Sequence, residues 1–232
     1  MRYIRNGLTV VAVACLLIAT TPPAAQAKKL EDAEIFIEIN DTDGDAGIQV
    51  FIDGEGWDVM ELRGPNGLEF SIAAQRGIGM QGITEFFFES AEPSFDVQTL
   101  DELLALFPEG QYKFKGLTTE GRRLKGRAEL THDLPAAPVF IFPVEGDEVD
   151  PDAAVFSWEE VPDPPGSEID AYVVVVECEE PGSEMAVEIP ADVTSITVPP
   201  EVLAGQEECK WEVLAVEESG NRTITESPFD LP

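Results

Sequence analysis

Alternation of apolar and polar residues dominates the chain from about residue 30. Ile35, Ile37 and Ile39 alternate with Glu34 and Glu38, which is the two-residue period of a half-buried strand. Similar patterns, separated by turn residues, predict a series of hairpins. The further strands are expected at 48–52, 57–62, 68–72, 112–118 and 124–131, with turns at 41–45, 54–56 and 65–67.

A short amphipathic helix is predicted just after residue 99. Thr99 and Glu102 have the spacing of a capping box, in which each residue satisfies a free amide of the first helical turn. Apolar residues then recur at helical spacing until Pro108 ends the run. They are Leu100, Leu103, Leu104 and Phe107.

An apolar cluster, Phe86-Phe87-Phe88, precedes this helix in a short strand or second helix. Large aromatic side chains usually supply core area, so we expect the cluster to be buried rather than to form a ligand surface.

The proline-containing stretch 135–138 (PAAP) is turn-rich, and a domain boundary is predicted there. The predicted fold class is therefore mainly β, with two β-sandwich modules. The N-terminal module covers 28–134 and contains the amphipathic helix, and the C-terminal module covers 135–232.

Residues 1–27 have the features of a secretory signal peptide. Arg2 and Arg5 precede an apolar stretch, and Ala25-Gln26-Ala27 has the small-residue pattern of a cleavage site. The apolar stretch is shorter than the ~20 residues of a spanning helix, and no second such stretch follows. We therefore expect a mature chain without a transmembrane span, either secreted or periplasmic. Residues 12–15 (AVAC) loosely resemble a lipoprotein motif ending at Cys15, but the apolar core continues past Cys15, which favours cleavage after Ala27.

The remaining chain is strongly acidic. Without Arg2 and Arg5 it has 12 basic and 46 acidic residues, a net charge of −34. Such a field repels nucleic acids and anionic membranes, so neither is predicted as a partner. It favours solubility, divalent cations and basic partners, although adaptation to a saline habitat is the simpler interpretation.

Residues 138–229 contain a series of short strand and turn patterns. They are VFI at 139–141, VFSW at 155–158, IDAYVVVV at 169–176, TSITVP at 194–199, Leu203 with Gly205, Trp211 with Val213, and Gly220-Asn221 before Thr223. In this order the patterns resemble a fibronectin type III domain of a secreted bacterial protein. The resemblance implies a seven-strand sandwich with Trp158, Tyr172, Val174, Trp211 and Val213 buried. It also implies a spacer, adhesion or interaction module, and it supplies no catalytic residue.

Two cysteines remain after the predicted export, Cys178 and Cys209. In an oxidising compartment an even pair favours a disulfide over a metal site or a nucleophile. The resemblance places Cys178 on the inner side of one strand and Cys209 at a corner of its antiparallel neighbour, where the family usually has tyrosine. It therefore implies a bridge, which would close a loop of about 30 residues and stabilise the fold by ~3–4 kcal/mol. Two free thiols are the alternative.

A candidate calcium loop lies between the first two predicted strands. Asp41, Asp43 and Asp45 occupy alternate positions beside Gly44, and Ca²⁺ prefers several such oxygen ligands. The loop is not an EF-hand, because the sixth residue is Ala46 and the twelfth is Ile52. Either it binds Ca²⁺ as a stabilising ion or it is a solvated acidic turn. No other cofactor is predicted.

A candidate docking patch for an anionic partner lies near the end of the N-terminal module. Six of the 12 basic residues fall between 113 and 127. If 112–118 pairs with 124–131, then Lys113, Lys115, Lys125 and Arg127 share one face. The patch docks an acidic polysaccharide or the acidic second module of another copy, or it neutralises nearby carboxylates or protects a sheet edge.

Catalytic motifs are absent from the sequence. His132 is the only histidine, and the GxSxG, HExxH and P-loop patterns do not occur. We therefore predict a non-catalytic, extracytoplasmic binding, adhesion or spacer protein, whose partner is a protein or a polysaccharide. The alternative is a carbohydrate-binding or hydrolase-associated protein with a site in the N-terminal module. An exposed aromatic platform at Trp57 or Phe86–Phe88, flanked by paired carboxylates, would favour that alternative.

Overall fold

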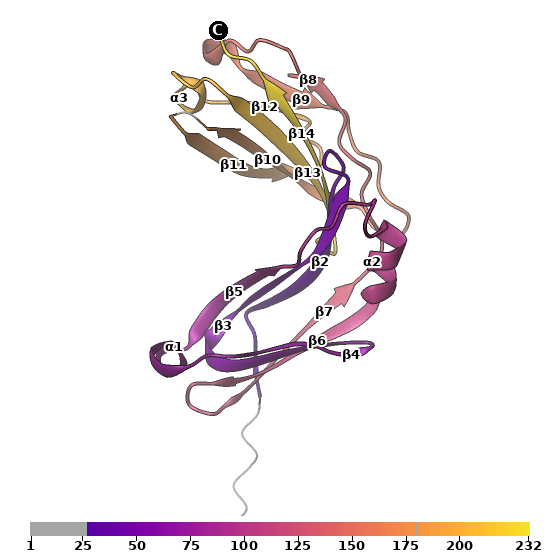
Figure 1. Ribbon diagram of the computed structural model, residues 1–232, viewed down its shortest axis with the longest axis vertical. Coiled ribbons are helices and arrows are strands. Elements are labelled where there is room, and N and C mark those ends of the chain that lie inside the picture. The colour runs from indigo at the N-terminus through magenta and orange to yellow at the C-terminus, as the bar shows by residue number, and fades with distance from the viewer. Residues whose placement is uncertain (1–26, 180) are drawn as a thin grey trace, which may run out of the picture.

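Strands form most of the chain in the computed structural model, which describes residues 27–179 and 181–232 (Figure 1). The predicted signal peptide, apart from Ala27, and Cys15 lie outside the described residues. The strands are β1 (Lys28–Lys29), β2 (Asp32–Asn40), β3 (Asp45–Gly64), β4 (Gly67–Ala73), β5 (Ile83–Glu89), β6 (Gly110–Thr118), β7 (Arg123–Leu130), β8 (Phe140–Phe142), β9 (Val155–Trp158), β10 (Ile169–Cys178), β11 (Ser183–Pro190), β12 (Ser195–Thr197), β13 (Cys209–Glu217) and β14 (Arg222–Phe229). The helices are α1 (Arg76–Gln81), α2 (Leu100–Leu106), the 3₁₀ turn η1 (Pro151–Ala153) and α3 (Pro200–Leu203).

The N-terminal module is organised around the long strand β3. The first part of β3 pairs with β2 and β5, and the second part pairs with β6 and β4. β7 extends the sheet beyond β6. The apolar sides of these strands enclose one hydrophobic cluster that includes Ile37, Ile52, Trp57 and Phe114.

A turn was predicted at 54–56, and this prediction is wrong. β3 continues through these residues as one strand of 20 residues, with register shifts near Trp57. Both glycines keep a negative or extended φ, so they do not form a turn. They allow a close approach instead: a Cβ atom at Gly54 would lie 2.9 Å from a Leu30 methyl, and one at Gly56 would lie 3.4 Å from the Gln81 carbonyl oxygen. The glycines thus let one strand bend and serve both parts of the module.

The predicted helix is confirmed as α2. The hydroxyl of Thr99 accepts a hydrogen bond from the Glu102 amide at 3.3 Å, and the Glu102 carboxylate accepts one from the Thr99 amide at 2.9 Å. Leu103 is buried in the module core. The sequence analysis did not predict α1, which buries none of its residues and therefore lacks an apolar pattern.

The expectation that Phe86–Phe88 is buried is wrong for Phe87 and Phe88 and holds only in part for Phe86, which is half-buried. All three lie in β5, whose side chains alternate between two faces. Phe86 packs against the core, with its ring 6.2 Å from that of Trp57. Phe87 is 54% exposed and Phe88 is 38% exposed, because β5 is an edge strand that only one neighbour covers.

The C-terminal module consists of two facing sheets. One has the order β12-β9-β8, and the other contains β14-β13-β10-β11. The two sheets enclose a second hydrophobic cluster that includes Trp158, Tyr172, Val174, Trp211 and Val213, each at most 1% exposed. The predicted burial of these five side chains is therefore confirmed. The hydroxyl of Tyr172 accepts a hydrogen bond from the Val161 amide at 2.8 Å, so burial of this ring leaves no unpaired oxygen.

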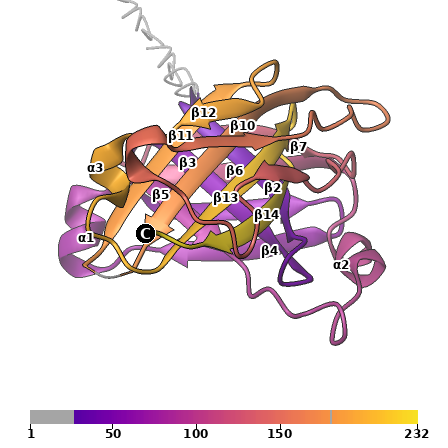
Figure 2. The same cartoon turned by 90° about the horizontal axis from the view of Figure 1, so that it is seen from above.

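The sheets of the two modules are continuous. β14 pairs in parallel with β2, from Arg222 beside Glu38 to Ile224 beside Asn40, and this pairing makes one sheet of eleven strands. Figure 1 shows the β2–β3 hairpin running from the lower module up beside β14. The described chain begins at the bottom of this view and ends at the top, and Figure 2 looks down the same axis.

The fold is thus mainly β, as predicted, with one large mixed sheet and one small sheet. Among the described residues, no helix has the length and apolar character needed to cross a membrane.

Candidate functional site

One fully buried side chain, Asn221, links the two modules. Its Oδ1 accepts a hydrogen bond from the Ile37 amide at 2.9 Å. Its Nδ2 donates to the Thr131 carbonyl at 3.1 Å, the Thr131 hydroxyl at 2.9 Å and the Asp133 carbonyl at 3.3 Å. Asn221 therefore joins the start of β14 to β2 and to the segment that connects the modules.

A buried carboxylate holds Asn221 in place. Glu217 is 1% exposed and accepts hydrogen bonds from the amides of Ser219 at 2.9 Å and Asn221 at 3.0 Å. The hydroxyls of Ser167 and Ser219 also donate to it. Four donors offset the cost of burying this charge. They also shape the β13–β14 turn, so that Asn221 points toward the N-terminal module.

We call the junction around Asn221, between β14, β2 and the connecting segment, the joint. Further contacts extend the joint along β14. The Thr223 hydroxyl donates to the Pro135 carbonyl at 2.8 Å. The guanidinium of Arg222 lies 4.0 Å from the centre of the Phe36 ring, and Phe36 is buried although it faces away from the core of its own module. The Asp41 amide donates to the Ile224 carbonyl at 3.0 Å. The joint thus combines sheet hydrogen bonds, a buried polar group and a cation–π contact.

Sequence reasoning did not find this joint. Gly220-Asn221 was interpreted only as a turn between two strands. The partner of Asn221 on β2 is Ile37, 184 residues away, and neither residue has a local pattern that indicates the contact. The only sequence signal of this contact is Phe36. It places an apolar residue between Glu34 and Glu38, on the side of the strand that otherwise alternates as polar with the isoleucines.

The structure places Cys178 directly opposite Cys209 in the β10–β13 register. Their Cα atoms are 4.1 Å apart, and their sulfur atoms are at disulfide distance, 2.07 Å. The pair lies at the end of β10 remote from the joint. It therefore closes the far end of the module core.

The candidate calcium loop forms the tip of the β2–β3 hairpin. The side-chain oxygen of Asn40 accepts hydrogen bonds from the amides of Thr42 and Asp43, both at 3.0 Å. Burial, with a smaller effect of Asp43, raises the pKa of Asp45. The structure does not bring Asp41, Asp43 and Asp45 together as a group of three ligands. Calcium binding by this loop stays a prediction.

A different acidic group does come together nearby. Among the described residues, Glu38, Glu89 and Glu92 form the one group of three whose ligand oxygens all lie within 4.8 Å of one another. Burial, with smaller contributions from the charges of Glu38, Glu89 and Asp45, raises the pKa of Glu92 to about 7. At neutral pH this cluster therefore holds a partly protonated carboxyl group.

The candidate docking patch forms one exposed face of the N-terminal module. Lys113 lies opposite Arg127 and Lys115 opposite Lys125 in the β6–β7 register, and all four side chains are exposed. We call these four residues the cationic face. None of them takes part in an ion pair with the described carboxylates. β6 lies inside the sheet, between β7 and β3, so protection of a sheet edge does not account for its lysines. Glu61 lies opposite Lys115 in the β3–β6 register.

An open groove borders the cationic face. It has a volume of about 460 Å³, and its lining includes Lys115, Arg123 and Lys125. The carboxylate of Glu61, also in the lining, forms an ion pair with Arg63 at 2.9 Å. Among the described residues, Lys115, Arg123 and Lys125 form no ion pair.

The features that would favour a carbohydrate or hydrolase site are present only in part, since Phe87 and Phe88 are exposed on β5. Trp57 is completely buried. A groove of about 530 Å³ between the modules is lined by carboxylates that include Glu34, Asp170 and Glu188, but no aromatic side chain lines it among the described residues. Such a groove offers no stacking surface for a sugar.

Comparisons with known proteins give no family. No family model matches the sequence, and no curated protein matches it. Solved structures that the chain is similar to include bacterial adhesins. One is a 1.5-MDa bacterial ice-binding adhesin, at 13% identity and a TM-score of 0.27, with 88% of this chain and 65% of that chain covered.

A second similar structure is a tetra-tandem repeat in the extending region of a large adhesion protein, at 10% identity and a TM-score of 0.31, with 87% and 50% covered. A third is a Ca²⁺-stabilized adhesin with which an Antarctic bacterium binds ice, at 12% identity and a TM-score of 0.25, with 86% and 49% covered. The chain spans less than two thirds of each of these structures. Because the identities and TM-scores are low, the function below is argued from the joint alone.

Proposed function

We propose that the protein is a non-catalytic, extracytoplasmic adhesion or spacer protein whose two β modules form one stiff, extended unit. The boundary between the modules lies at about residue 135, and the C-terminal module is a fibronectin type III-like domain. The two facing sheets β12-β9-β8 and β14-β13-β10-β11 support that assignment, because their seven strands agree with the seven-strand sandwich that the resemblance implies. The partner is a protein or a polysaccharide outside the cytoplasm.

The buried joint carries this proposal. Modules joined by a flexible linker share few contacts, and their relative motion is the default. Here Asn221 satisfies backbone groups of β2 and of the connecting segment in a position that water does not reach. Bending the joint would leave these groups unpaired, at a cost of about 1–3 kcal/mol each. The joint therefore resists bending.

The ends of the described chain support a spacer. They lie at opposite ends of the long axis (Figure 1), so the molecule spans its full length between them. The Cys178–Cys209 pair stabilises the module farther from the predicted signal peptide. Ca²⁺ bound at the β2–β3 hairpin would stiffen the joint further, since this hairpin reaches β14 through Thr42 and Glu226.

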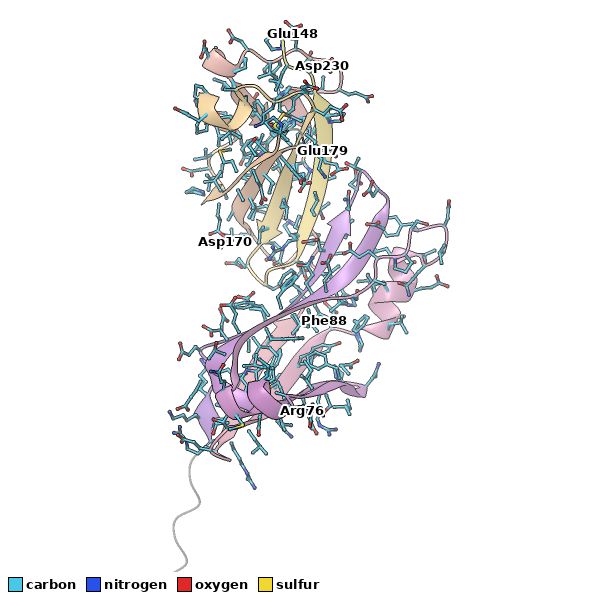
Figure 3. All side chains as sticks on the ribbon, turned by 60° about the vertical axis from the view of Figure 1, so that its left-hand side comes forward. Arg76, Phe88, Glu148, Asp170, Glu179 and Asp230 are labelled. Atoms are coloured by element: carbon cyan, nitrogen blue, oxygen red, sulfur yellow. A yellow bond between two sulfur atoms is a disulfide. The ribbon has the colours of Figure 1, made fainter. Side chains whose placement is uncertain are left out.

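A distance measurement across the joint tests the proposal. Spin labels are attached at Arg76→Cys and Glu148→Cys, two exposed positions in different modules (Figure 3). We expect a narrow distribution of label distances in the otherwise unchanged protein and a broad one after Asn221→Ala. Asn66→Ala, in the exposed β3–β4 turn, is the matched control and leaves the distribution narrow. A broad distribution without any change at Asn221 would refute the stiff unit.

A further inference from the structure

Two oppositely charged sheet faces lie on different modules. The cationic face, defined above, presents four positive charges as two directly opposed pairs. Like charges in opposed positions repel and destabilise a sheet. Glu61 lies opposite Lys115 in the β3–β6 register but pairs with Arg63, so these four cations stay without an ion pair among the described residues and form a surface suited to an external anion.

The outer side of the sheet β11-β10-β13-β14 carries the opposite charge. In its register Glu177 lies opposite Glu184, and Glu212 lies opposite Glu226. Glu188 follows Glu184 on the same side of β11. We call these five glutamates the acidic face.

One cation lies among the five glutamates. The ammonium of Lys210 is 2.9 Å from Glu212, 3.0 Å from Glu226 and 3.9 Å from Glu177. Three of the five carboxylates contact this ammonium, and the charge of Arg222 acts on Glu188, so the acidic face keeps a surplus of negative charge. Glu184 and Glu188, on the edge strand β11, have no ion pair among the described residues. The surplus is therefore concentrated at this edge.

We infer that the chain associates head to tail, with the cationic face of one copy docked on the acidic face of the next. Both faces are sheet surfaces on which opposed residues of neighbouring strands lie about 5 Å apart. The cations of one face are complementary to the surplus of negative charge on the other. Because the faces differ, the contact is heterologous and leaves one free face at each end of a dimer, so further copies add to form chains or rings.

These charges favour a second copy of the chain, rather than an acidic polysaccharide, as the partner that binds the cationic face. Nothing in the cationic face selects a sugar, since no aromatic residue lies among its four cations. The acidic face, in contrast, supplies a surface of opposite charge within the same chain. This inference goes beyond the proposed stiffness and does not depend on it.

Salt gives association between copies a distinctive signature. Each chain has a formal net charge of −32, so copies repel one another at low ionic strength, where the Debye length is about 30 Å at 0.01 M. At about 0.15 M this long-range repulsion is screened beyond about 8 Å, while contacts between docked faces persist. At 1 M the contacts are screened too. Association should therefore be strongest at intermediate salt.

Charge reversal of each face provides the test, with sedimentation velocity over a range of concentration and salt as the measurement. The first variant is Lys115→Glu with Lys125→Glu, and the second is Glu184→Lys with Glu188→Lys. We expect wild type to form chains at intermediate salt and each variant alone to lose at least tenfold in association. An equimolar mixture of the two variants should associate again, because the reversed faces complement each other.

A control variant carries the same change in total charge as the first variant at an unrelated place. Gln75→Glu, Arg76→Glu and Gln81→Glu lie at α1, and all three positions are exposed. This variant should associate like wild type. If the first variant fails to fold by circular dichroism, Lys113→Glu with Arg127→Glu replaces it.

Three results would overturn the inference. They are a wild type that stays monomeric at every salt concentration, reversed variants that associate like wild type, and a mixture that does not recover. A separate binding experiment passes each protein over immobilised dextran sulfate. A monomeric wild type that is retained there, with retention lost in the first variant, would assign the cationic face to an acidic polysaccharide instead.

Discussion

Replacing Asn221 with alanine removes the central hydrogen-bonding group of the joint and leaves three backbone groups without their partner. These are the Ile37 amide and the carbonyls of Thr131 and Asp133. The Thr131 hydroxyl keeps its contact with Ser219 at 2.9 Å. An unpaired buried group costs about 1–3 kcal/mol. Because water entering the vacated space recovers part of this, we expect a loss of about 3 kcal/mol in the free energy of unfolding.

Urea unfolding measures this loss, with Asn66→Ala as the control that should stay within about 0.5 kcal/mol of wild type. Hydrogen exchange gives a local readout, because the Ile37 amide should exchange faster in Asn221→Ala. A second variant, Asn221→Asp, keeps the acceptor for this amide but sets a negative charge against two carbonyl oxygens. It should be destabilised at neutral pH and recover as the pH falls.

The reasoning fails if Asn221→Ala unfolds like Asn66→Ala. It also fails if stability falls while exchange of the Ile37 amide is unchanged, since the loss would then arise away from the joint.

Three further predictions follow from the charged and sulfur-containing groups. The raised pKa of Glu92, about 7 against an ordinary 4.5, means that stability from this group is greatest below pH 4.5 and is lost as the pH rises through 7. After discounting for partial exposure, the loss in the free energy of unfolding is roughly 1 kcal/mol. Thermal melts at pH 5 and pH 8 should show this loss in wild type and not in Glu92→Gln. Equal pH dependence in both proteins would contradict the prediction. Replacing Cys178 and Cys209 together by serine should cost about 3–4 kcal/mol in urea unfolding under oxidising conditions, and no difference from wild type would show that the thiols are free. Ca²⁺ should raise the melting temperature beyond what saturating NaCl achieves, and Asp43→Asn should remove this excess; equal shifts in both proteins would leave only a solvated acidic turn.

Local patterns predicted the elements of this fold whose signals lie within a few residues. Alternation located most strands, and the capping box at Thr99 and Glu102 located α2. β11 was not assigned, although Met185, Val187 and Ile189 alternate with exposed positions. Its signal was present but weak, because the strand is an edge that buries only one side.

The joint and the course of β3 could not be predicted from such patterns. Gly54 and Gly56 are typical turn residues, and only the close passage of Leu30 and Gln81 shows that they allow a bend instead. The contact of Asn221 with Ile37 depends on how two modules meet. In both cases the determining partner is far away in sequence, and local propensity cannot report it.

The parallel pairing of β2 with β14 has a mechanical consequence. β2 runs from the lower end of the molecule up to the joint, and β14 runs from the joint up to the other end (Figure 1). A pull on the two ends of the described chain therefore draws the paired strands past each other along their length. The hydrogen bonds between Glu38–Asn40 and Arg222–Ile224, which cross between the strands, are loaded in shear and must break together rather than one after another. Tension along the chain therefore loads the joint in the direction in which its hydrogen bonds resist most strongly.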